Sequence, residues 1–77
     1  MKVTRYFESM RQRPDRAAIR LQWVRYVVEH PMRGRAAGRR IRRWAAIAEM
    51  DGRYLRVILL PNGETVRNAF FDRSFQP

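Results

Sequence analysis

Residues 53–71, RYLRVILLPNGETVRNAFF, set the expected architecture of this chain. Two runs rich in β-branched and aromatic residues flank Asn62-Gly63, a dipeptide typical of a two-residue hairpin turn. A second dipeptide of this kind, Asp51-Gly52, follows an apolar run that begins at Trp44. Strands joined in succession by tight turns form a meander, so we expect a three-stranded antiparallel sheet within residues 41–73.

Two-residue turns would fix the strand register and with it the two faces of the sheet. The core face would then carry Trp44, Ala46, Ala48, Leu55, Val57, Leu59, Val66 and Phe70. The other face would carry Arg43, Ala45, Ile47, Glu49, Tyr54, Arg56, Ile58, Leu60, Arg67, Ala69 and Phe71. Basic side chains interleaved with aromatic rings suit a single-stranded nucleic acid, because arginine binds phosphate while rings stack on bases. The alternative is an ordinary outer face, covered by the tail of the chain or by another subunit.

A short helix is predicted near the N-terminus. Val3, Phe7 and Met10 recur at helical spacing, and Thr4 is a candidate N-cap. Arg13-Pro14-Asp15 then interrupts the pattern, because a residue before proline avoids helical dihedral angles.

A longer helix is predicted from Arg16 to His30, with Asp15 as its N-cap and Pro31 as its end. Its main apolar stripe, expected to face the sheet, consists of Ala17, Leu21, Val24 and Val28, with Val27 at its edge. A second apolar series on nearly the opposite face consists of Ile19, Trp23, Tyr26 and His30. A helix that is apolar on two faces is buried on both or meets another chain. Either the first helix covers this series, or Ile19, Trp23 and Tyr26 form a homodimer interface.

Together these patterns predict an α+β fold, with two N-terminal helices packed on a three-stranded antiparallel β-meander. The length of 77 residues fits a single domain, residues 1–77, with a thin hydrophobic core. Within it we expect a helical half at 1–32, an Arg/Gly-rich loop at 33–40, the sheet at 41–73 and a tail at 74–77.

Charge is the strongest compositional feature. Seventeen basic residues oppose seven acidic ones, which gives a net charge of +10, and the pI is near 11.7. Every basic residue except Lys2 is arginine, whose planar guanidinium suits phosphate and stacks on bases. A charge of this size attracts polyanions. We therefore expect a nucleic acid as the partner, with an acidic protein as the alternative; arginine density reads phosphate and does not distinguish RNA from DNA.

The composition also excludes several classes of protein. The absence of cysteine excludes disulfides and thiolate metal sites, and the single histidine, His30, excludes a multi-histidine metal site within one chain. No carboxylate cluster or glycine-rich phosphate loop is present, so neither a metal nor a cofactor is expected. The apolar runs are too short to cross a bilayer and no signal peptide is visible, so we expect a cytoplasmic protein that makes no membrane contact.

Residues 33–43, RGRAAGRRIRR, hold the densest basic cluster. A run of like charges is usually a solvated surface, but it is also suited to track phosphates and to become ordered on binding. On the second interpretation the nucleic-acid-binding residues are Arg33, Arg35, Arg39, Arg40, Arg42 and Arg43, together with Arg73 and Phe71.

The segment from Arg53 to Arg73 resembles the C-terminal strand pair of small bacterial proteins in the RelE/BrnT toxin-like group. It is most similar to a branch of that group with the pattern YLRV…DG-x-T-v-x-NAF-x-DR, and Val27 to Pro31 is similar to the end of a helix in the same branch. The resemblance implies two N-terminal helices on an antiparallel sheet. It also implies an mRNA endoribonuclease, ribosome-dependent or free, that an antitoxin neutralises, so an acidic antitoxin protein is an expected partner.

The resemblance implies site residues as well. Arg56 and Arg67 become the phosphate-binding candidates, with Asn68, Asp72 and Arg73 as their neighbours. Two departures remove groups that could move a proton. The stretch Tyr6-Phe7-Glu8 lacks the histidine of BrnT-like relatives, and Arg67 stands where the branch often has histidine.

Cleavage of RNA by its own 2′-hydroxyl needs a base, an acid and a cationic cradle for the phosphorane. The catalytic candidates are Arg56, Arg67, Glu49, Tyr54 and Asp72. Arginine stays protonated and is a poor base, so such a nuclease would be slow or would depend on the ribosome. The sequence leaves three hypotheses: an RNA-binding protein of RelE/BrnT toxin-like type with endoribonuclease activity, a non-catalytic nucleic-acid-binding module, or an interaction protein that docks an acidic partner.

Overall fold

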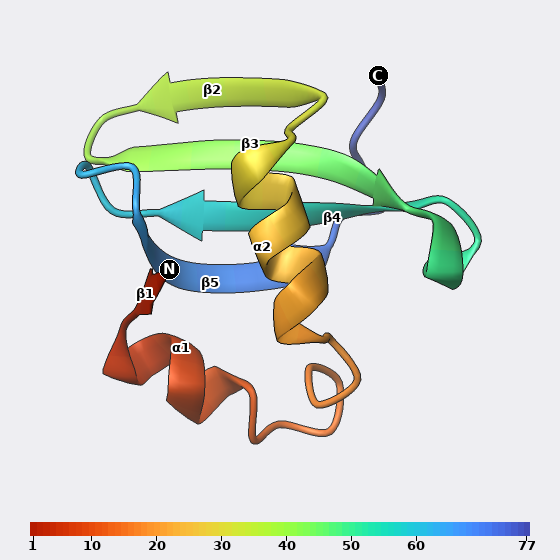
Figure 1. Ribbon diagram of the computed structural model, residues 1–77, viewed down its shortest axis with the longest axis horizontal. Helices are drawn as coiled ribbons and strands as arrows, with labels where there is room; N and C mark the ends of the chain where they lie inside the picture. The colour runs from red at the N-terminus through yellow and green to blue at the C-terminus, as the bar shows by residue number, and fades with distance from the viewer.

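The computed structural model describes residues 1–77 and shows a mixed sheet with two helices (Figure 1). The elements in chain order are β1 (Lys2–Val3), α1 (Arg5–Met10), α2 (Leu21–Glu29), β2 (Arg33–Ala37), β3 (Arg40–Ile47), the 3₁₀ turn η1 (Ala48–Met50), β4 (Arg53–Leu59) and β5 (Thr65–Phe71). The structure is α+β, but the expected three-stranded meander is wrong. The sheet has five strands in the order β1-β5-β4-β3-β2, and β1 runs parallel to β5 while every other pair is antiparallel.

The first error concerns residues 33–40, which form a hairpin with β3 and not a loop. Strand β2 pairs with β3 over its whole length, and the turn between them is Gly38-Arg39. Gly38 has φ +59°, the positive value that a two-residue hairpin turn requires at its first central position. The sequence does not predict this strand by hydrophobicity, because residues 33–37 are basic or small and contain no run of large apolar side chains. Its period of two is nevertheless present, since Arg33 and Arg35 alternate with Gly34 and Ala36.

The second error is the register between β3 and β4. The connection from 48 to 52 has five residues, because η1 precedes Asp51 and Gly52, which both have positive φ. As a result Leu55 pairs with Ala45, three positions before the expected Ala48. An odd shift exchanges the two faces of a strand. Ala45 and Ile47 are therefore buried in the core, and Trp44 lies on the opposite side of the sheet.

Between β4 and β5 the expected register holds only beside the turn. Leu59 pairs with Val66 as predicted, but a bulge between Ile58 and Leu59 then shifts the pairing by one residue. Arg56 consequently faces Phe70. The core thus receives Ala69, and Phe71 packs against it, while Phe70 moves to the other face.

Helix α1 begins as predicted. Thr4 is its N-cap, and the Thr4 hydroxyl accepts a hydrogen bond of 3.0 Å from the N–H of Phe7. Phe7 is 2% exposed and joins the core. Val3 belongs to β1 and not to this helix, and the N–H of Thr4 continues the parallel pairing by donating to the carbonyl of Val66.

Helix α2 is shorter than predicted, because it begins at Leu21 and not at Arg16. Asp15 caps no helix and instead forms ion pairs with Arg13 and Arg16, at 3.6 and 3.7 Å. The buried side chains of α2 are Trp23, Val24 and Val27, and Ile19 from the preceding turn joins them. This face combines members of both predicted stripes.

Most of the predicted homodimer interface is buried inside the monomer. Ile19 and Trp23 are 4% and 7% exposed and are packed inside the monomer, whereas Tyr26 is 49% exposed. Leu21, expected in the core, is 43% exposed.

Helix α2 crosses the sheet over β3 and β4, and α1 packs beside β5 (Figure 1). Neither helix has the length and apolar character needed to cross a membrane.

Leu55→Ala should lower the free energy of unfolding by about 2–5 kcal/mol, because Leu55 is fully buried and its truncation leaves a cavity. Leu21→Ala is the matched control, and the same truncation at this exposed position should change stability by no more than ~0.5 kcal/mol. Urea denaturation of the three proteins measures both effects. Equal losses would mean that Leu21 packs in the core after all.

Candidate nucleic-acid interface

One row of side chains crosses four strands on the sheet surface opposite α2, here called the open face. Arg33 of β2 pairs with Trp44 of β3, Trp44 pairs with Arg56 of β4, and Arg56 pairs with Phe70 of β5. Directly opposed residues of neighbouring strands point to the same side of a sheet. The cross-strand row Arg33–Trp44–Arg56–Phe70 therefore alternates cation and ring.

The members of the row touch through their charges and rings. The guanidinium of Arg56 lies 5.5 Å from the ring centre of Trp44 and 5.3 Å from that of Phe70. Arg16, from the turn before α2, lies 5.2 Å from the ring centre of Phe70 and donates a 2.8 Å hydrogen bond to Oδ1 of Asn68. Each such cation–π contact contributes about 0.5–2 kcal/mol. The two rings thus hold the guanidinium groups of Arg16 and Arg56 in place.

The tail adds one more ring to this face. Figure 1 shows the chain after β5 passing behind the sheet, on the side away from α2, and ending near β2. Phe75 stacks on Trp44 with 5.0 Å between ring centres and 18° between planes, and it lies 5.0 Å from Tyr54. Arg33 lies over the ring of Phe75 at 5.4 Å. The tail therefore covers part of this face, but at Trp44 and Tyr54 and not at Ile58 and Leu60, the positions at which the sequence suggested a covering tail.

Asp72 anchors the start of the tail. One carboxylate oxygen accepts hydrogen bonds from Nε1 of Trp44 at 3.0 Å and from Arg56 at 3.5 Å. The other oxygen accepts from the backbone N–H and the hydroxyl of Ser74. Both oxygens are occupied, so Asp72 holds the row in place and has no oxygen left to act on a substrate.

The pKa of Asp72 follows from these contacts. Burial by itself raises the pKa, but the hydrogen bonds from Ser74 and Trp44 and the charge of Arg56 outweigh burial, so the pKa lies below its ordinary value. A carboxylate with a lowered pKa is a weak general base. The lowered pKa argues against Asp72 as a catalytic base.

The remaining arginines of the open face have no acidic partners. Arg35 stands directly opposite Arg42, and the ion pairs of the chain involve only Asp15 and Asp72 as acids. Like charges directly opposed across strands destabilise a sheet. The Nε atoms of Arg42 and Arg56 are also buried without a hydrogen-bond partner. This end of the open face is a site of uncompensated positive charge.

A hollow of about 300 Å³ lies at this end, between the tail and β2. The residues that line it are Arg33, Arg35, Arg42, Trp44, Arg56, Asp72, Ser74, Phe75 and Gln76. Four guanidinium groups around a concave surface match the chemistry of a phosphodiester, which arginine binds through two parallel hydrogen bonds.

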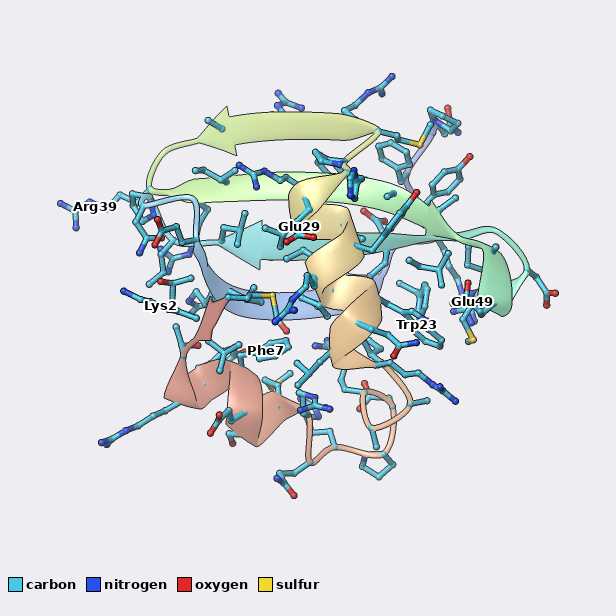
Figure 2. All side chains as sticks on the ribbon, viewed as in Figure 1. Lys2, Phe7, Trp23, Glu29, Arg39 and Glu49 are labelled. Atoms are coloured by element: carbon cyan, nitrogen blue, oxygen red, sulfur yellow. The ribbon has the colours of Figure 1, made fainter.

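The predicted nucleic-acid-binding residues fall into three groups, of which two lie on the open face or beside it. Arg33, Arg35, Arg40 and Arg42 lie on the open face by register. Arg39 projects from the turn at the end of the β2–β3 hairpin (Figure 2), and Arg73 is exposed on the tail.

Arg43 and Phe71 lie on the helix side, contrary to the prediction, because the register places them there. Arg43 donates a 2.9 Å hydrogen bond to the carbonyl of Val28 and so satisfies a free carbonyl in the last turn of α2. Phe71 meets Trp23 edge to face and carries the guanidinium of Arg53 at 4.5 Å. Both residues have structural partners.

The five catalytic candidates do not converge. Arg56, Tyr54 and Asp72 are associated with the open face. Arg67 instead lies over the ring of Tyr6 in α1 at 4.6 Å, and Glu49 accepts a 3.2 Å hydrogen bond from Nε1 of Trp23 beside α2 (Figure 2). The prediction that Glu49 and Tyr54 share one face of the sheet is wrong, since Glu49 lies in η1 on the helix side and Tyr54 pairs with Ala46. No three His, Cys, Asp or Glu side chains gather to hold a metal ion.

Sequence reasoning missed several members of this site. Two-residue turns predict a register that places Trp44 and Phe70 on the core face. The sequence offers Phe75 only as part of a covering tail, and it predicts Arg16 inside a helix. The spacing of Asp72 and Ser74, which suits a side chain that bonds its own backbone two residues on, was the one available indication that the tail turns back.

Comparisons with protein-family models, with curated proteins and with solved structures find no match for this chain. No relative therefore bears on the RelE/BrnT resemblance, which stays a prediction. Any proposal about function must therefore rest on the chemistry of the open face.

Asp72→Asn should lower the free energy of unfolding at pH 7 by about 1–3 kcal/mol, because it weakens a nearly buried set of hydrogen bonds. Since the folded pKa is lowered, the stabilisation is complete above the unfolded pKa of about 3.9 and disappears as the pH falls through the folded value. Thermal melts between pH 2 and 7 should show the two proteins converging at low pH. Glu29→Gln, at an exposed carboxylate without an ion pair, should run parallel to the wild type; a constant gap for Asp72→Asn would contradict the assignment.

Proposed function

We propose that this chain is a non-catalytic module that binds single-stranded nucleic acid, with RNA as the favoured ligand, through its open face. The observation that carries the proposal is the cross-strand row Arg33–Trp44–Arg56–Phe70. Rings and cations alternate across strands that stand about 4.8 Å apart. A single strand offers the complementary alternation of base and phosphate.

The energetics favour a single strand over a duplex. Stacking of an unpaired base on an aromatic side chain is worth about 1–3 kcal/mol, and a duplex hides its bases from such contacts. The arginines of β2 and β3 supply the phosphate contacts, since they have no carboxylate partners. Relief of the repulsion between Arg35 and Arg42 adds to the binding free energy.

The same geometry argues against a nuclease. Glu49 is on the helix side, Arg67 is engaged with Tyr6, and Asp72 is held by four donors. The open face therefore offers a cationic cradle without a free base beside it. An RNA-binding role in the cytoplasm fits this chemistry better than cleavage by a toxin-like enzyme.

Replacement of Arg35 and Arg42 together by glutamine should weaken binding to a labelled ten-nucleotide uridine RNA at least tenfold. Two lost phosphate contacts should also reduce the slope of log K against log salt by about 1.4. Fluorescence anisotropy titrations at several salt concentrations measure both quantities. Stability should not fall, because the substitution removes a repulsive pair.

The matched control is Arg5→Gln with Arg25→Gln, which removes the same charge from exposed positions on α1 and α2. Its affinity should fall only by the general effect of net charge. Equal losses in the two double variants would mean that binding is non-specific attraction to a +10 protein. Failure of the wild type to bind RNA or single-stranded DNA at ~0.15 M salt would favour an acidic protein partner.

End-labelled single-stranded RNA incubated with the wild-type protein should stay intact, because no free general base lies beside the cradle. Gel analysis for fragments that end in 2′,3′-cyclic phosphate tests this expectation. Such fragments, absent with Arg56→Ala plus Arg67→Ala, would overturn the non-catalytic assignment. A translation extract with added ribosomes provides the same test for ribosome-dependent cleavage.

A further inference from the structure

The ring of Phe75 occupies the position on the open face that a nucleobase would occupy. It lies nearly parallel to the indole of Trp44, with 18° between planes, and meets Tyr54 at 58°. The guanidinium of Arg33 covers it at 5.4 Å. A stacked indole, a second ring at an angle and an arginine overhead form a slot for a planar aromatic group.

The slot opens onto the basic hollow. Trp44, Phe75 and Arg33 line the hollow together with Arg35 and Arg42. A nucleotide whose base filled the slot would have its phosphate within the reach of these guanidinium groups. Phe75 brings a ring to the slot but no phosphate, so it leaves the surrounding charge uncompensated.

The segment that carries Phe75 is held weakly. The last backbone–backbone hydrogen bond of the chain is donated by Asp72 to the carbonyl of Tyr54, so residues 73–77 make none. Beyond Ser74, the only hydrogen bond to the tail is the one that Arg33 donates to the carbonyl of Gln76, at an exposed position. Displacement of Phe75 therefore breaks little besides its own ring contacts.

We propose that the slot formed by Trp44, Tyr54 and Arg33 is a nucleobase subsite, and that the chain's own Phe75 occupies it until a base displaces the tail. The inference rests on the proposed function and deepens it, because it names the base-binding position and an internal competitor. Binding of a single strand then exchanges one stack for another. It also frees Arg33 from Gln76 and Phe75 to bind phosphate.

Phe75→Ala tests the competition. The variant should bind the ten-nucleotide uridine RNA about three- to tenfold more tightly than the wild type, the range that one aromatic stack is worth. Pro77→Ala, at a position of the same tail that carries no aromatic ring, should leave the affinity unchanged. An oligonucleotide of abasic ribose phosphates has no base to enter the slot, so Phe75→Ala should increase its binding affinity less than it increases that of the uridine RNA.

A fluorescence measurement without RNA checks that the slot has opened. With Trp23→Phe, Trp44 is the only tryptophan, and its quenching by acrylamide should increase when Phe75→Ala is added. In the Trp23→Phe protein with Phe75 intact, saturation with uridine RNA should quench Trp44, because a base replaces the phenyl ring.

The outcomes separate the two levels of inference. Weaker binding of RNA by Phe75→Ala than by the wild type would make Phe75 part of the binding platform and overturn its role as a competitor. Equal affinity of the two proteins would also overturn that role. Binding that never changes the fluorescence of Trp44 would overturn the subsite while leaving RNA binding intact. Absence of binding by the wild type and by Phe75→Ala alike would overturn the proposed function and the subsite with it.

Discussion

The register between β3 and β4 is the constraint on which the rest of the molecule depends. The five-residue connection at 48–52 sets Leu55 opposite Ala45 and Arg56 opposite Trp44. This choice sends Ala45 and Ile47 into the core and turns the indole toward the other side. A connection with one residue fewer would exchange the faces of β3, bury Arg42, and remove the ring against which Arg56 and Phe75 pack.

The two sides of the sheet are stabilised by different kinds of interaction. The side covered by α2 holds the one apolar cluster, and even its arginine, Arg43, is used to satisfy the carbonyl of Val28. The open face is stabilised instead by stacked rings, cations and the carboxylate of Asp72. A chain of 77 residues has too small a core to cover both sides of a five-stranded sheet. One face of the sheet is therefore left without a covering helix.

Local chemistry was predictable from the sequence, and register was not. Thr4 as a cap, the pairing of Leu59 with Val66, and an arginine-rich surface with aromatic rings could all be predicted, because each depends on neighbouring residues. The length of the 48–52 connection and the bulge at Ile58 depend on how the whole sheet packs against α2, which no dipeptide records. Strand β2 was missed because its alternation is between arginine and small residues, a pattern that hydrophobicity does not reveal.

Under the proposed function, the opposed pair Arg35 and Arg42 would make folding and ligand binding thermodynamically linked. Their repulsion is present only when β2 lies beside β3, so it is a frustration built into the native state and absent from the unfolded chain. A polyanion that bridges them binds the native state alone and raises the unfolding free energy by RT ln(1 + [L]/Kd). The β2–β3 hairpin at the sheet edge would then be the part that the ligand stabilises most, and its amide hydrogens are the ones whose exchange with solvent the ligand should slow most.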